Sequence, residues 1–123
     1  MICYLAAKYT YMTRCAMIAQ QLRKNGHIVN AGWLSGIHTG ILPEEQAQYA
    51  EEDLRDIDAS DTLVLFQFPC GDPEYSTGRH VEFGYAKAKG KHLILVGPRT
   101  SVFHYNEKIE HHQTLESFLE SYL

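Results

Sequence analysis

This chain of 123 residues lacks the features that mark several broad classes of protein. Its longest apolar runs have fewer than ten residues, too short for a helix that spans a bilayer. It has no run of Lys and Arg, and its formal charge of -4 argues against a nucleic-acid binder, which needs a basic face. The N-terminus has no basic lead before a long apolar segment, unlike a signal peptide. We therefore expect neither a membrane nor a nucleic acid as partner.

Cysteine is also scarce. Cys3, Cys15 and Cys70 are odd in number and show no C-x-x-C spacing, which is typical of reduced thiols in a cytoplasmic protein and not of disulfides or a zinc site. Of the seven histidines, His111 and His112 are adjacent, and adjacent residues on a strand point to opposite faces. That arrangement suits chelation badly, so we predict no metal.

What the chain does contain is a regular alternation of strand and helix patterns. Short apolar runs predict strands at 2–7, 27–31, 62–66, 92–97 and 109–113, and helical spacing predicts helices at 11–24, 43–60, 78–89 and 115–123. This order predicts an α/β fold in which a mostly parallel five-stranded sheet lies between two layers of helices. The length fits a single domain, residues 1–123. In such sheets the ligand crevice lies beyond the carboxyl ends of the strands.

The segment from Ser76 to Ala86 is the most informative part of the chain. A polar loop with a glycine opens a helix there, and Glu82 lies in its first turns between Val81 and Phe83. A carboxylate among apolar neighbours is poorly solvated, which is a common way to build a reactive acid or nucleophile. On the helix pattern alone, a solvated glutamate without a role is the alternative interpretation.

Two further residues are expected near Glu82. Tyr4 lies near the exit of the first strand, and Asp53 lies in the helix that leads into the third strand. Two carboxylates and a phenol suit the cleavage of a glycosidic bond, because one carboxylate can attack the anomeric carbon while the other protonates the leaving group. A separation of about 5 Å implies a covalent intermediate, and a wider one implies direct attack by water.

Three motifs in order carry a family resemblance: Tyr4-Leu-Ala-Ala, Asp53-Leu-x-x-Ile-x-x-x-Asp61, and Ser76-x-Gly-x-x-x-Glu82-x-Gly-x-Ala. Together they resemble the nucleoside 2-deoxyribosyltransferase family, which includes the 2'-deoxynucleoside 5'-phosphate N-hydrolases. The resemblance covers nearly the whole chain. It implies a flavodoxin-like fold, a homodimer or higher homo-oligomer with sites near the interface, no cofactor, and cleavage of the N-glycosidic bond of a nucleotide or nucleoside.

The resemblance also implies roles for these residues. Glu82 matches the nucleophile that attacks C1', Tyr4 the phenol that orients it, and Asp53 the acid that protonates or hydrogen-bonds the departing base. Ser76 stands six residues before the nucleophile, where the transferases typically have an aspartate and the phosphate hydrolases a serine. With Gly78 at the helix start, it favours a 5'-phosphorylated substrate.

Other positions are candidates for substrate binding. Lys8, Arg14 or Arg79 is expected to supply the cation for a phosphate, and the residues leave the choice open. Ser101 and Asn106 follow the fourth strand, where the family sends residues across the dimer into the neighbouring site. Trp33 is expected either to cover the base or simply to pack. We predict hydrolysis of a (deoxy)nucleoside 5'-monophosphate; the alternatives are base exchange between deoxynucleosides and a non-catalytic nucleotide-binding module.

Overall fold

The computed structural model describes residues 1–36, 38–68 and 77–123 of the chain. The strands are β1 (Ile2–Ala6), β2 (Ile28–Val29), β3 (Thr62–Phe66), β4 (His92–Val96) and β5 (Glu110–His112). The α-helices are α1 (Met12–Lys24), α2 (Pro43–Asp58), α3 (Gly78–Ala88) and α4 (Leu115–Tyr122). Three short 3-10 turns are η1 (Tyr9–Tyr11), η2 (Gly32–Ser35) and η3 (Val102–His104).

The five strands form one sheet in the order β2-β1-β3-β4-β5, and every neighbouring pair is parallel. This is the flavodoxin-like α/β arrangement, so the predicted fold is confirmed. The second strand is shorter than predicted, Ile28–Val29, because the chain turns away into η2. The first helix begins at Met12, after the separate turn η1.

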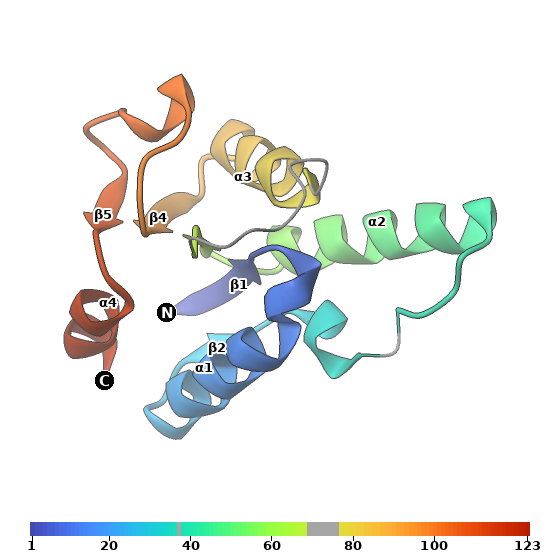
Figure 1. Ribbon diagram of the computed structural model, residues 1–123, viewed down its shortest axis with the longest axis horizontal. Coiled ribbons are helices and arrows are strands. Elements are labelled where there is room, and N and C mark those ends of the chain that lie inside the picture. The colour runs from blue at the N-terminus through green and yellow to red at the C-terminus, as the bar shows by residue number, and fades with distance from the viewer. Residues whose placement is uncertain (37, 69–76) are drawn as a thin grey trace.

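The sheet lies between two layers of helices, with α2 and α3 on one face and α1 and α4 on the other (Figure 1). All five residues of β3 are buried, as continuous apolar strands require when both faces of a parallel sheet are covered. Phe66 of β3 meets Phe118 of α4 edge-on, with ring centroids 5.6 Å apart. Burial of this sheet is therefore the main source of core stability.

In this strand order, β1 is the switch point of the sheet: β2 is added on one side of it and the later strands on the other. β1 pairs with β2 on one side and with β3 on the other, so the connections leave it toward opposite halves of the sheet. A crevice opens at such a switch point, at the carboxyl ends of the strands. The backbone is closely packed at this edge of the sheet. Gly97, directly after β4, has φ +112°, and a Cβ there would lie 2.3 Å from the Gln67 carbonyl oxygen.

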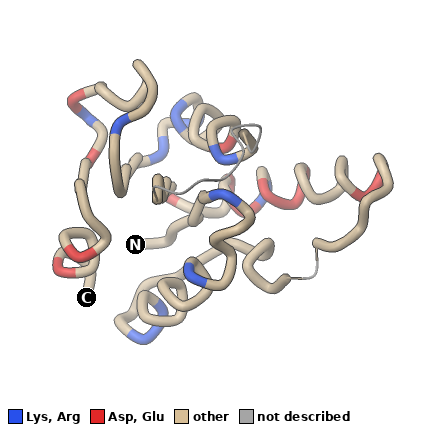
Figure 2. Tube along the Cα trace, viewed as in Figure 1, with Lys and Arg blue, Asp and Glu red and all other residues tan. Residues whose placement is uncertain are grey.

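Charge is unevenly distributed over the helices. Figure 2 shows acidic residues along α2 and basic residues along α1. α2 starts with Pro43 as its first residue, and its first turn carries Glu44 and Glu45, which suit the positive end of a helix. The Leu42 backbone N–H donates to Glu45 Oε1 at 3.3 Å. The acidic helix α2 thus runs from this solvated end toward the crevice.

The described residues contain neither a membrane-spanning helix nor a cluster of metal-binding side chains. No helix among residues 1–36, 38–68 and 77–123 is long and apolar enough to cross a bilayer. Within the same residues, no group of three or more His, Cys, Asp or Glu side chains is placed to hold a metal ion. Cys3 and Cys15 are buried and free, and burial raises the pKa of each thiol to about 12; Cys70 lies outside the described residues.

Candidate active site

A pocket of about 730 Å³ opens at the carboxyl edge of the sheet, beside β1. Its walls come from β1, the segment that follows β2, helix α2 and the first turns of α3. Five of the predicted site residues line it: Tyr4, Trp33, Asp53, Gly78 and Glu82. The structure therefore brings together residues that lie up to 78 positions apart in the chain.

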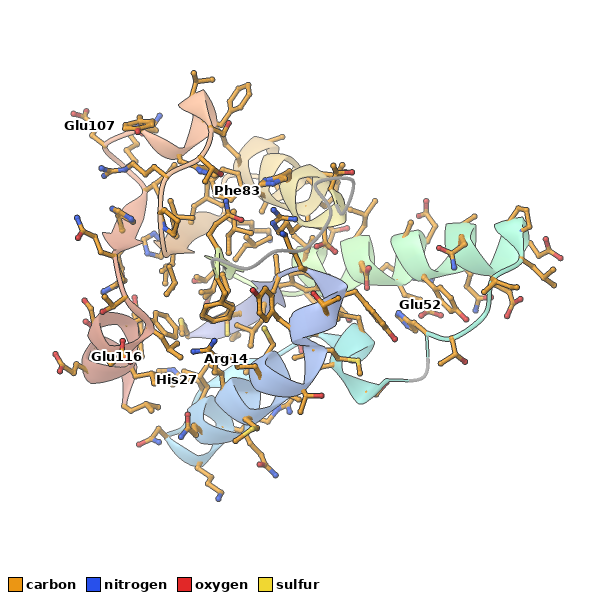
Figure 3. The ribbon with its side chains drawn as sticks, viewed as in Figure 1. Arg14, His27, Glu52, Phe83, Glu107 and Glu116 are labelled. Atoms are coloured by element: carbon orange, nitrogen blue, oxygen red, sulfur yellow. The ribbon has the colours of Figure 1, made fainter. Side chains whose placement is uncertain are left out.

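Tyr4 and Glu82 form the centre of the pocket. Tyr4 is 1% exposed, and its phenol donates a hydrogen bond to Glu82 Oε2 at 2.5 Å. Helix α3 buries Phe83 and Ala86 in the core (Figure 3). In this orientation of the helix, the Glu82 side chain reaches Tyr4 of β1. Glu82 is therefore a partly buried carboxyl group held by a core side chain.

Asp53 completes the group from α2, which packs beside α3. The Asp53 and Glu82 carboxyl groups line the same pocket and lie close enough for each to affect the pKa of the other. Asp53 Oδ1 is buried and has no hydrogen-bond partner among the described residues. An unpartnered buried oxygen is costly unless something else satisfies it. This oxygen is thus a natural contact for a bound ligand.

Burial governs the protonation of all three groups. It raises the pKa of Asp53 to about 6 and that of Glu82 to about 8. The hydrogen bond from Tyr4 lowers the pKa of Glu82, and the nearby Asp53 carboxyl raises it. The pair therefore retains a proton to higher pH than an isolated carboxyl group would. Burial, and then the charges of Glu82 and Asp53, raise the pKa of Tyr4, so the phenol remains a donor.

Aromatic side chains form the wall beside these acids. Trp33 is 6% exposed, and its indole N–H donates to the Leu5 carbonyl oxygen at 2.9 Å. Tyr9 approaches it with ring centroids 6.4 Å apart. The side chain of Trp33 is thus part of the core and part of the pocket wall at once. A planar ligand would find a flat, rigid surface there.

The start of α3 supplies the polar end of the pocket. Gly78 and Arg79 line it, and Arg79 Nε donates to Gln67 Oε1 at 2.9 Å. Of the three candidate cations, Arg79 is the one among the pocket-lining residues. The Arg14 guanidinium instead lies over the Phe68 ring, 4.3 Å from its centroid (Figure 3). Lys8 lies within electrostatic range of the start of α3. The pKa of His80 on that helix is lowered first by burial, then by the charge of Arg79, and also by the charge of Lys8.

Two other predicted residues, Ser101 and Asn106, are not among those that line the pocket. Ser76 lies outside the described residues. Ser101 Oγ accepts from the Phe103 N–H at 3.2 Å, and Ser101 lines a second hollow of about 500 Å³ between α3 and η3. Asn106 Oδ1 accepts from the Lys108 N–H at 2.9 Å, in the turn before β5. A role for Ser101 and Asn106 in substrate binding stays a prediction.

Sequence reasoning passed over Tyr49, which also lines the pocket. A signal for it existed, because Tyr49 precedes Asp53 by four residues and so lies on the same face of α2. Gln67 was missed as well; it directly follows the buried strand β3, at the ligand edge of the sheet, and it is 7% exposed. A polar residue buried at that edge is a general indication of a site.

Two solved structures are similar to this chain. A 2-deoxyribosyltransferase from the bacterium Bacillus psychrosaccharolyticus superposes with a TM-score of 0.61 at 22% identity, covering 83% of this chain and 76% of that one. A CMP N-glycosidase from Clostridium botulinum gives a TM-score of 0.64 at 19% identity, covering 98% and 97%. Both belong to the nucleoside 2-deoxyribosyltransferase family. This chain has the fold of that family. No family model matches the sequence, and no curated protein does.

Proposed function

We propose that this chain cleaves the N-glycosidic bond of a nucleoside 5'-monophosphate or a nucleoside, with Glu82 as the nucleophile. One observation carries the proposal: a core phenol donates to the Glu82 carboxyl group, and the Asp53 carboxyl group lines the same pocket. This arrangement supplies a nucleophile, an acid and an orienting donor without any further group. The similarity to a deoxyribosyltransferase and a CMP N-glycosidase supports the proposal that the target is an N-glycosidic bond.

The first step transfers the sugar to the protein. A Glu82 carboxylate oxygen attacks C1', the bond from C1' to the base nitrogen breaks, and its electron pair leaves with the base. The reactive form is the one in which Glu82 is ionised and the proton is on Asp53; this proton passes from Asp53 to the base, which departs neutral. The Tyr4 hydroxyl donates to Glu82 throughout, which holds the attacking carboxylate in place and favours its ionised form.

The second step releases the sugar. A water molecule attacks C1', and the bond from C1' to the Glu82 oxygen breaks, which restores the carboxylate. Asp53 accepts the proton of the attacking water, so both carboxyl groups return to their starting state. If a second base attacks in place of water, the same site performs base exchange, which is the alternative function.

The start of α3 favours the phosphorylated substrate. Backbone N–H groups at a helix N-terminus attract anions, and Gly78 and Arg79 line the pocket at this end. The guanidinium of Arg79 is anchored through its Nε on Gln67, whose Nε2 in turn donates to Thr100 Oγ1 at 2.6 Å. An arginine held in this way suits a phosphate, and the position of Ser76 in the motif agrees with this preference.

The proposal includes a homodimer. Val81 and Phe103 are large apolar side chains that are each more than half exposed, and both line the hollow between α3 and η3. Thr77 lines both this hollow and the pocket. A second copy packed there would cover the exposed side chains beside the site. Light scattering after size exclusion, for the wild type and Phe103→Glu, tests this: the wild type is expected to be a dimer and the variant a monomer.

The decisive test is base release from a panel of nucleosides and their 5'-monophosphates, each with and without a competing free base. Release from monophosphates alone, unchanged by added base, would support hydrolysis. Exchange on unphosphorylated nucleosides would establish the transferase. In the Asp53→Asn variant given a substrate whose base is a good leaving group, a mass increase on Glu82 equal to the transferred sugar or sugar phosphate would show the covalent intermediate. Ligand-induced stabilisation with no base release from any substrate would contradict catalysis and favour a binding module.

A further inference from the structure

The pocket wall opposite α3 holds an imidazole in a fixed position. His38 Nε2 lies 2.9 Å from Glu52 Oε2, and the His38 side chain is 10% exposed. Its ring stacks on Tyr49 with centroids 4.3 Å apart and planes 11° from parallel. Glu52 projects from α2 toward the segment that carries His38 (Figure 3). The imidazole is therefore held by an ion pair and by a stacked ring at the same time.

The segment that carries His38 is docked on α2 by further contacts. The Gly40 N–H donates to Tyr49 Oη at 2.8 Å, and Gln46 Nε2 donates to the Gly40 carbonyl at 2.7 Å. Gly40 is also close to α2: a Cβ there would lie 1.8 Å from Glu45 Oε2, so a larger residue would displace the end of the Glu45 side chain. These contacts restrict the segment, so the position of His38 in the pocket is set before a ligand arrives.

Asp53 lies beside this wall: it follows Glu52 directly on α2 and lines the same pocket as His38. The groups that act on it are Tyr4 from β1, His38 from the docked segment, Glu52 and Asp56 from α2, and Glu82 from α3. After burial, which raises the pKa of Asp53, His38 lowers that pKa and Glu52 raises it. The two partners of one ion pair thus act on Asp53 in opposite directions.

We propose that His38 and Glu52 are a positioning pair that balances the charge beside Asp53 and so places the active pH range of the site. The inference rests on the proposed function, in which Asp53 is the acid. Neither residue is assigned a proton transfer. A lone His38 cation would stabilise the Asp53 carboxylate and deplete the acid, whereas a lone Glu52 carboxylate would hold the proton too tightly. Keeping both in contact avoids each extreme.

The test compares the pH profiles of kcat/KM for base release in the wild type, Glu52→Gln and His38→Gln. Both limbs of the profile are expected to move to lower pH by about half a unit in Glu52→Gln and to higher pH by a similar amount in His38→Gln. Glu51→Gln is the matched control, because it removes the same charge from the adjacent, exposed position of α2. Its limbs are expected to coincide with those of the wild type.

Opposite shifts with an unmoved control would support the pair. A lower rate at every pH with unmoved limbs would overturn the inference, because contacts that only hold the segment in place would lower the rate without moving the limbs. Should His38→Gln fail to fold, the shift in Glu52→Gln decides alone. If the wild type releases no base, the proposed function fails, and the inference is then tested separately by carboxyl ¹³C NMR titration of Asp53 in the wild type and in Glu52→Gln. An unshifted Asp53 titration would then overturn it.

Discussion

Two glutamates in this molecule are both partly buried, Glu82 more deeply than Glu110, and have opposite electrostatics. Glu110, on the edge strand β5, accepts from Tyr122 Oη at 2.8 and 2.9 Å, and its oxygens lie 2.7 Å from His112 Nε2 and 3.1 Å from His92 Nε2. Burial raises the pKa of Glu110, but the hydrogen bonds from His112, Tyr122 and His92 outweigh it and hold that pKa below its ordinary value. Glu82 accepts one hydrogen bond, from the phenol of Tyr4, and lies beside the carboxyl group of Asp53. Its pKa is raised, first of all by burial.

The difference lies in burial, which is deeper at Glu82, and in the number of donors. Several donors on a carboxylate stabilise its charge and join the elements that supply them, here β4, β5 and α4. With one donor and a second acid nearby, the charge is poorly stabilised and the group is ready to react. Glu110 therefore has the surroundings of a structural residue, and Glu82 those of a catalytic one. The predictions below test this contrast.

The largest effect is expected for Glu82→Ala. Loss of the nucleophile should reduce base release by at least about 10³-fold. The melting temperature should not fall, because the substitution removes a poorly solvated carboxyl group. Base release and circular-dichroism melting curves give the two readings, with Glu107→Gln as control, an exposed glutamate of the turn before β5 (Figure 3). A variant that keeps its rate would exclude Glu82 as the nucleophile.

The next effect is expected for Asp53→Asn. The amide cannot deliver a proton to the base, so kcat/KM should fall about 10²- to 10³-fold. The loss should be smaller for substrates whose base is a good leaving group, since these need less protonation. A uniform loss across leaving groups would point to binding and would contradict the role of Asp53 as an acid.

A smaller effect is expected for Tyr4→Phe. Removing the hydroxyl takes away the hydrogen bond that lowers the pKa of Glu82, so the acidic limb of the pH–rate profile should move to higher pH. The rate near neutral pH should fall about 10- to 100-fold. The profile of kcat/KM from pH 5 to 9 is the measurement. A rate loss without a shifted limb would mean that Tyr4 only fills space.

Glu110→Gln should show the reverse behaviour, with activity retained and stability lost. Replacing the carboxylate weakens four contacts, and we expect the free energy of unfolding to fall by about 1–3 kcal/mol. Urea unfolding at pH 7 measures this, and kcat/KM at 20 °C below the melting temperature should match the wild type within about twofold. Loss of activity in fully folded protein would contradict the contrast between the two regions.

The smallest effect is a pair of opposite pH dependences. The raised pKa values of Glu82 and Asp53 mean that the folded state binds more protons than the unfolded state, so these groups lower stability as the pH rises from about 4 to about 8. The lowered pKa of Glu110 acts in the other direction: its contribution is present above pH 4.5 and is lost as the pH falls through its folded pKa. Melting temperatures of Glu82→Ala and Glu110→Gln, each minus the wild type, should diverge in opposite directions over these ranges.

Much of the fold follows from local patterns. The continuous apolar runs 62–66 and 92–97 correctly predict β3 and β4, and the apolar spacing of 11–24 predicts α1 to within one residue. The length of β2 could not be predicted, because the point where a strand leaves the sheet depends on its neighbours. The docking of His38 on Tyr49 and Glu52 is equally hidden, since it joins a loop to a helix without any repeating pattern.

The sequence by itself determined the order of strands and helices and placed Glu82 among apolar neighbours, because periodicity and composition are local properties of the chain. Tertiary structure decided which groups share the pocket. The sheet order β2-β1-β3 lays α2 and α3 side by side over β1, and this alone brings Asp53 and Glu82 together at the phenol of Tyr4. Whether a carboxyl group has donors or only another acid beside it depends on that packing, and so do its charge and its chemistry.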